Sequence, residues 1–172
     1  MNEMDNGAGV GGGGPGAPAL RLARTAMFAA AYAALTILFA PISYGPLQMR
    51  ISEAMTVLPW LYPEAVPGLF VGCLIANLFG GNGIWDIVFG SLATLAAAVL
   101  SRRMKRVWLA PFPPVAVNAV VIGAVLSRLL GLPFWLTAIE VGAGQVGACY
   151  ILGLPLLLVL RRRAAGRKPP EN

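Results

Sequence analysis

Three clusters of basic residues lie at the edges of long apolar segments, and this arrangement is the strongest constraint on the fold. With 58% hydrophobic and 12% charged residues, the chain has too little polar surface to coat a soluble globule. Basic clusters beside apolar segments are typical of the cytoplasmic side of an integral membrane protein, so the net charge of +6 indicates membrane orientation and not nucleic-acid binding. The clusters hold most of the 13 Lys and Arg residues: Arg21 and Arg24; Arg102, Arg103, Lys105 and Arg106; and Arg161, Arg162, Arg163, Arg167 and Lys168.

Six apolar segments follow one another along the chain, and we expect each to be a membrane helix. A spanning helix needs about 20 apolar residues, and fewer when other helices partly enclose it. Pro and Gly residues lie at most of the boundaries, where they interrupt helices. The sequence therefore predicts an all-α integral membrane protein with a bundle of six transmembrane helices. The segments cover approximately residues 22–40, 52–63, 66–80, 84–100, 107–130 and 134–160.

An even number of crossings separates the basic clusters when the six segments alternate in direction. All three clusters then face the cytoplasm, and both termini are predicted to be cytoplasmic. The weakest part of this count is the 52–80 region, which can also form one span and a re-entrant piece. The predicted domains are a disordered Gly-rich tail at 1–20, a transmembrane domain at 21–163 and a basic, polar cytoplasmic tail at 164–172.

Most of the remaining charged residues gather at the predicted outer side. Arg50 and Glu53 flank the start of the second segment, Asp86 begins the fourth, and Glu140 lies within the sixth. Ionisable groups at membrane depth cost about 2.5–3.5 kcal/mol each, so they usually face a cavity or one another. We interpret them as lining a site.

Each of these acids also has a purely structural interpretation. Glu140 can form an ion pair with Arg50 or Arg128 that ties helices together. Glu53 can cap the first helical turn beside Ser52. Asp86 can stabilise the positive end of a helix dipole.

Three amide side chains, those of Asn77, Asn118 and Gln145, lie inside apolar segments. An amide there either bonds a neighbouring helix or reads the donors and acceptors of a ligand. The chain has no His, which excludes Ser-His nucleophiles and the H-E-x-x-H zinc site. Cys73 and Cys149 are expected to be inert, and no metal or cofactor is predicted.

The first segment carries small residues four positions apart, which make a flat helix face that another helix can approach closely. This face can pack inside the protein or dock a partner subunit. It consists of Ala26, Ala29, Ala30, Ala33 and Ala34.

Three stretches of the sequence resemble the QueT family. They are APISYGPLQMRISEA at 40–54, PEAVPGLFVGCLIAN at 63–77 and DIVFGSLATL at 86–95. The resemblance extends from Arg21 to Arg163. It implies a substrate-binding S component of an energy-coupling factor (ECF) importer in the plasma membrane of a prokaryote. The substrates it implies are the queuosine precursors preQ0 and preQ1, which are 7-deazaguanines held near the outer face.

The resemblance also implies partners. A transmembrane coupling subunit of the EcfT type would dock on the Ala face, and two ATPases of the EcfA type would drive transport. The chain itself has no G-x-x-x-x-G-K-[ST] phosphate loop, so we do not expect it to be an enzyme. The other expected partners are the small-molecule substrate and membrane lipid, and no nucleic acid is expected.

A 7-deazaguanine presents a pair of donors, the ring N1–H and the exocyclic amine, which suit a carboxylate such as Glu53 or Glu140. Its carbonyl suits an amide or Arg, and Tyr44, Trp85 or Trp135 can stack on the ring. Three alternatives stay open: an S component for another vitamin-like nutrient, a small intramembrane enzyme, and a purely structural subunit. The candidate substrate-binding residues are Tyr44, Gln48, Arg50, Glu53, Asn77, Trp85, Asp86, Asn118, Glu140 and Gln145.

Overall fold

The computed structural model describes residues 16–44, 50–81 and 83–166, and within these ranges the chain is helical with short turns and no β-strand. The predicted all-α class is therefore confirmed for the described residues. The elements are α1 (Ala17–Leu38), α2 (Ala40–Ser43), the 3₁₀ helix η1 (Ile51–Trp60), α3 (Ala65–Gly80), the π-helix η2 (Asp86–Gly90), α4 (Ser91–Arg102), the 3₁₀ helix η3 (Val107–Leu109), α5 (Phe112–Leu130), α6 (Phe134–Val146), the π-helix η4 (Gly147–Gly153) and α7 (Leu154–Ala165).

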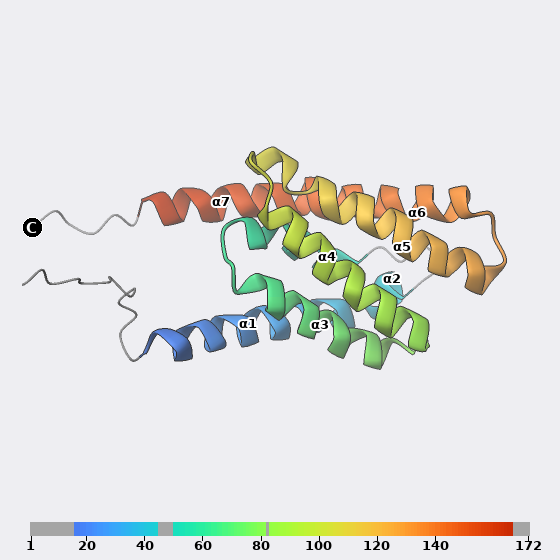
Figure 1. Ribbon diagram of the computed structural model, residues 1–172, viewed down its shortest axis with the longest axis horizontal. Coiled ribbons are helices and arrows are strands. Elements are labelled where there is room, and N and C mark those ends of the chain that lie inside the picture. Colours follow the sequence, from blue (N-terminus) through green and yellow to red (C-terminus); the bar gives the residue numbers. More distant parts are fainter. Residues whose placement is uncertain (1–15, 45–49, 82, 167–172) are drawn as a thin grey trace, which may run out of the picture.

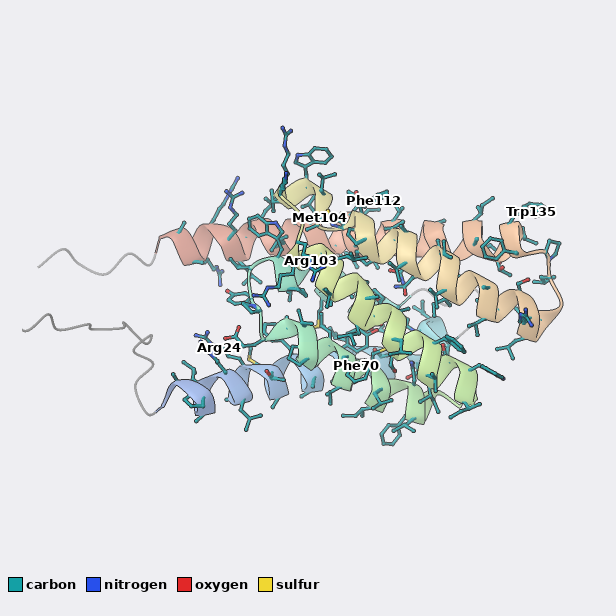
Figure 2. The ribbon with its side chains drawn as sticks, in the orientation of Figure 1. Arg24, Phe70, Arg103, Met104, Phe112 and Trp135 are labelled. Atoms are coloured by element: carbon teal, nitrogen blue, oxygen red, sulfur yellow. The ribbon has the colours of Figure 1, made fainter. Side chains whose placement is uncertain are left out.

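The helices form an elongated bundle in which α1 begins and α7 ends at the same end (Figure 1). Arg24 and Arg103, from two of the basic clusters, lie toward that end, whereas Trp135 lies at the opposite end (Figure 2). The observed arrangement therefore agrees with chain segments that alternate in direction. It places these two residues on the side of the bundle where α1 begins and α7 ends.

Glycines let α1 and α3 approach each other closely. A Cβ atom added at Gly72 would lie 2.6 Å from the carbonyl oxygen of Ala29, and one at Gly68 would lie 2.7 Å from that of Thr25. Both distances are too short for a carbon atom, so this contact requires residues without side chains. Two other glycines, Gly81 and Gly131, end α3 and α5 with φ of 69° and 67°. This left-handed conformation is the one that glycine adopts most readily at a helix end.

The 3₁₀ helix η1 is the central element of the bundle. It contacts α1, α3, α4, α5, α7 and η4, and its residues 52–59 are all buried. On one side Gly153 of η4 permits the contact, because a Cβ atom there would lie 2.7 Å from the carbonyl oxygen of Ala54. Long 3₁₀ runs are uncommon and often mark functional or strained segments. The fold thus places the predicted second segment where it can present side chains to the interior.

The six predicted segments correspond closely to the observed helices, although α1 begins at Ala17, earlier than predicted. Within the described residues, two stretches are long and apolar enough to cross a membrane by length and composition, namely Val107–Leu130 and Phe134–Ala165. Ala65–Gly80 is a shorter apolar helix. Helix length and composition thus support two crossings, and the count of six stays a prediction.

Candidate functional site

Glu53, in the first turn of η1, is the most deeply buried acid among the described residues. Its side chain is 1% exposed, and it makes no capping hydrogen bond to the helix. Three side chains from three helices donate to it instead. The hydroxyl of Tyr32 on α1 donates to Oε1 at 2.5 Å, that of Thr94 on α4 donates to Oε1 at 3.4 Å, and Nδ2 of Asn118 on α5 donates to Oε2 at 3.2 Å. The capping interpretation of Glu53 is therefore wrong.

Arg50 lies immediately before η1 and forms a buried ion pair with Asp86 of η2. Its Nη2 is 2.8 Å from Oδ2 of Asp86, and both side chains are almost inaccessible. The Nδ2 of Asn77 on α3 donates to the backbone carbonyl of Asp86 at 3.0 Å and so supports this segment. The pair joins the start of the second predicted segment to the start of the fourth. Asp86 therefore neutralises a buried guanidinium in addition to any effect on a helix dipole.

Tyr44 covers the same guanidinium from the end of α2. The centre of its ring is 5.8 Å from Cζ of Arg50, a distance at which a cation is attracted to an aromatic face. Its hydroxyl donates to the backbone carbonyl of Ala76 at 2.6 Å. Burial raises the pKa of Tyr44 above its ordinary value, so the phenol keeps its proton and the hydrogen bond at neutral pH.

A small cavity lies between these groups. Its volume is about 10 Å³, enough for about one water molecule, so a bicyclic ligand requires side chains to move apart. One buried donor of the cavity residues, the Nε of Arg50, lacks a partner among the described residues. The Oε1 of Gln145 accepts from the Sγ of Cys149 at 3.5 Å, which leaves the Nε2 of the same amide to donate elsewhere. The residues lining the cavity are Arg50, Glu53, Gly90, Thr94, Asn118, Ile122, Val141 and Gln145.

A second, apolar hollow of about 650 Å³ lies between η2 and α5. Trp85 and Phe89 form one wall as a stacked pair, with ring centres 5.7 Å apart, and Arg128 is the charged residue of the lining. Trp85 is 57% exposed and is absent from the lining of the polar cavity. The two hollows are thus separate sites with different chemistry.

Four of the candidate binding residues line the polar cavity, namely Arg50, Glu53, Asn118 and Gln145. Three more, Tyr44, Asn77 and Asp86, contact these residues or one another as described above. Trp85 lines the apolar hollow, and Gln48 lies outside the described residues.

Glu140 is half-buried on α6 but does not line the cavity. Within the described ranges it forms no ion pair with Arg50 or Arg128. Trp135 is 63% exposed at the far end of the bundle (Figure 2). The geometry therefore favours Glu53 over Glu140 as the carboxylate of the site.

Sequence reasoning did not identify Tyr32 and Thr94, which donate to Glu53. Both are polar residues inside apolar segments, and such residues tend to hydrogen-bond across helices. The sequence therefore shows that such hydroxyls are candidates for contacts between helices. It does not show which acid each hydroxyl will reach.

The Ala residues of α1 divide into two groups. Ala29 and Ala33 are buried at 7% exposure, and Ala29 lies against Gly72 of α3. Ala26, Ala30 and Ala34 are exposed and recur every four residues. The inner pair therefore packs within the protein, and the outer three form a smooth exposed strip, here called the outer Ala strip.

Comparison with known proteins supplies the family context. Residues 22–162 match the family model described as QueT transporter. A segment of 72 residues is 33% identical to the protein named "Queuosine precursor transporter QueT" of Lactococcus lactis. That segment covers 41% of this chain and 42% of the relative. No solved structure matches the chain.

Proposed function

The chain belongs to the QueT transporter family, and we propose that it is the S component of an ECF importer that binds a 7-deazaguanine precursor of queuosine. The observation that carries this proposal is the combination of groups at the polar cavity. Glu53 offers a buried carboxyl group, Arg50 offers an Nε donor without a partner among the described residues, and Gln145 lines the same cavity with its amide. The family itself is one of transporters and not of enzymes.

These groups complement the base edge of a 7-deazaguanine. The ring N1–H and the exocyclic amine would donate to Glu53, and the carbonyl would accept from Arg50 or Gln145. In a dry site each pairing discriminates strongly, because a ligand that lacks it leaves a buried polar group unpaired. Since the cavity has room for only about one water molecule, binding would separate α5 and α6 from η1. Tyr44, whose ring lies against the Arg50 guanidinium, would then cover the ligand.

The topology proposed for transport has six crossings, with both termini in the cytoplasm of a prokaryote. Its support is the common end at which α1 begins and α7 ends (Figure 1), together with Arg24 and Arg103 of two basic clusters, which lie toward that end (Figure 2). The crossing formed by η1 would be partial. Its 10 residues span only about 20 Å at the 3₁₀ rise of about 2.0 Å per residue, against a hydrocarbon core of about 30 Å.

Energy for transport would come from partner subunits. A coupling subunit of the EcfT type would dock on the outer Ala strip, and two EcfA-type ATPases would hydrolyse ATP. The strip supports this role because three small residues four apart on an exposed helix face allow close helix packing.

The pairing of Arg50 with Asp86 is also what a purely structural subunit would show. Ligand binding decides between the two. We propose to titrate the detergent-purified chain with preQ1, preQ0, guanine and queuine by calorimetry. Tight binding of a 7-deazaguanine supports the proposal. If none binds to the folded protein, the substrate assignment is wrong, and a panel of other vitamins tests the alternative S-component function.

A further inference from the structure

The apolar hollow between η2 and α5 has one charged residue in its lining, and we propose that it binds an anionic phospholipid. Its volume is about 650 Å³, and every lining residue except Arg128 is hydrophobic. An acyl chain would fill the apolar part, and the phosphate of the headgroup would pair with the Arg128 guanidinium. The proposal requires that α5 crosses the membrane, and it does not depend on which ligand enters the polar cavity.

The hollow lies on a segment that suits the bilayer. Val107–Leu130, which contains α5, is one of the two described stretches long and apolar enough to cross a membrane. The lining residues of α5 run from Val120 to Leu129, which is about 14 Å along the axis at a rise of about 1.5 Å per residue. Since the hydrocarbon core is about 30 Å thick, this length corresponds to about one leaflet.

The walls of the hollow are accessible from outside the bundle. Trp85, Val120 and Leu129 are each at least half exposed. Lipid tails are as apolar as these side chains, so they contact such a surface without cost. An unfilled hollow would lose dispersion contacts along its lining, and apolar walls give water no hydrogen-bond partners. An acyl chain is therefore the occupant that matches the apolar part of the hollow.

Arg128 determines which headgroup suits the hollow. It is exposed in the last turn of α5, and within the described ranges it forms no ion pair. No acidic residue of the described chain lines the hollow with it. An Arg near the end of a membrane helix extends its charge to the interface, where a guanidinium pairs well with a phosphate. Trp85, on the opposite wall, is of a type enriched at the same depth.

Arg128 also has a simpler role, because a cation in the last turn stabilises the helix dipole. That role explains a charge at the end of α5. It does not require an apolar hollow beside the charge or a stacked aromatic wall facing it. The combination of one cation with an apolar hollow is the complement of an anionic lipid.

The test measures which lipid touches Trp85. Replacing Trp60, Trp108 and Trp135 by Phe leaves Trp85 as the one Trp of the full chain. This protein is placed in phosphatidylcholine vesicles that contain brominated-chain phosphatidylglycerol or brominated-chain phosphatidylcholine, because bromine quenches Trp emission on contact. We expect the lipid beside Trp85 to be phosphatidylglycerol with a preference of about fivefold.

Two variants assign this preference to one side chain. Arg128→Gln should bring the ratio of the two lipids toward one, because the cation of the lining is removed. Lys105→Gln is the matched control, since it removes the same charge from an exposed position of a basic cluster. It should leave the ratio unchanged. Glycerol 1-phosphate, which has the phosphate without acyl chains, should not compete.

Four results would overturn the proposal. They are equal quenching by both lipids, an unchanged preference in Arg128→Gln, loss of the preference on adding glycerol 1-phosphate, and quenching by neither lipid, which would mean that protein covers the hollow. Should the protein with Trp85 alone not fold, native mass spectrometry of the chain with all four Trp residues replaces the quenching measurement. Arg128→Gln must then reduce the retention of phosphatidylglycerol relative to phosphatidylcholine more than Lys105→Gln does, and an equal reduction would overturn the proposal.

Discussion

The Nδ2 atom of Asn118 lies 3.2 Å from Oε2 of Glu53, and this bond joins α5 to η1 across 65 positions of the sequence. Together with the bonds from Tyr32 and Thr94, it fixes the carboxylate from three sides. The acid at the centre of the bundle is thus held by neutral groups and stays available to a ligand that carries donors.

Replacing this carboxylate should abolish ligand recognition. Glu53→Gln keeps the shape of the side chain but replaces one carboxylate oxygen with an amide nitrogen. This nitrogen is a donor, so it would face a donor of the 7-deazaguanine in place of an acceptor. We expect the affinity for preQ1 to fall about 100-fold, because a buried donor is left unpaired. Calorimetry on the purified protein measures this.

The matched control for that experiment is Glu64→Gln. Glu64 lies at the other end of the bundle, where it pairs with Arg24 at 3.5 Å. Its substitution should leave affinity within about twofold, because surface ion pairs contribute little. Glu140→Gln is a separate test of the alternative carboxylate. If it weakens binding as much as Glu53→Gln does, the assignment of the site to the η1 acid is wrong.

The buried ion pair should stabilise the fold only as a pair. Arg50→Met leaves the Asp86 charge without its guanidinium, and such a change typically costs about 3–5 kcal/mol. We expect a clear fall in Tm for this variant. In the double variant Arg50→Met/Asp86→Asn the fall should be smaller than the sum of the two single falls, because both charges are removed together. Additive falls would show that the two residues do not interact.

The contact between α1 and α3 should not tolerate even a methyl group. Gly72→Ala would bring Cβ to 2.6 Å from the carbonyl oxygen of Ala29, so the helices must move apart. Overpacking of this kind costs about 1–3 kcal/mol. The control is Gly142→Ala on α6, where the added Cβ would meet only the Cβ of Ala119 at 3.5 Å. Thermal unfolding in detergent should show a loss of stability for the first variant and little change for the second.

The bounds of the helices follow from local chemistry, which is why the sequence predicts them well. The segment predicted at 66–80 is the helix Ala65–Gly80, and it ends at Gly81, whose positive φ suits glycine. Apolar segments, Pro and Gly are all visible in a single sequence. The general region of the site was visible for a similar reason, since charged residues are rare within membrane segments.

The partners within the site do not follow from local chemistry. Nothing in ISEAMTVLPW specifies a 3₁₀ helix, and its conformation depends on burial among six other elements. The choice between Glu53 and Glu140 depends on how the helices rotate, because a helical residue faces inward or outward by packing. Sequence alone therefore names the candidates, whereas the fold decides that Glu53 meets Tyr32.

The outer Ala strip should be needed for assembly and not for ligand binding. Ala30→Trp places a large ring on the exposed face of α1, away from the cavity. We expect unchanged affinity for preQ1 and loss of copurification with the coupling subunit. Ala143→Trp, at an exposed position on α6, is the control and should retain the complex. Equal loss in both variants would show that the effect is not specific to α1.

The six-crossing topology predicts which residues a reagent can reach from each side of the membrane. Lys105 belongs to a basic cluster, and Leu132 lies in the turn between α5 and α6; both are exposed. Single cysteines at these positions can be labelled with a membrane-impermeant maleimide in intact cells. Background reaction should be low, because Cys73 and Cys149 are buried. Leu132→Cys should react in intact cells, and Lys105→Cys only after lysis. Between Lys105 and Leu132 the only predicted crossing is the segment that contains α5. Labelling of both cysteines from outside would therefore show that this segment does not cross the membrane. The number of crossings between the basic clusters would then no longer be even, and the prediction of two cytoplasmic termini would fail.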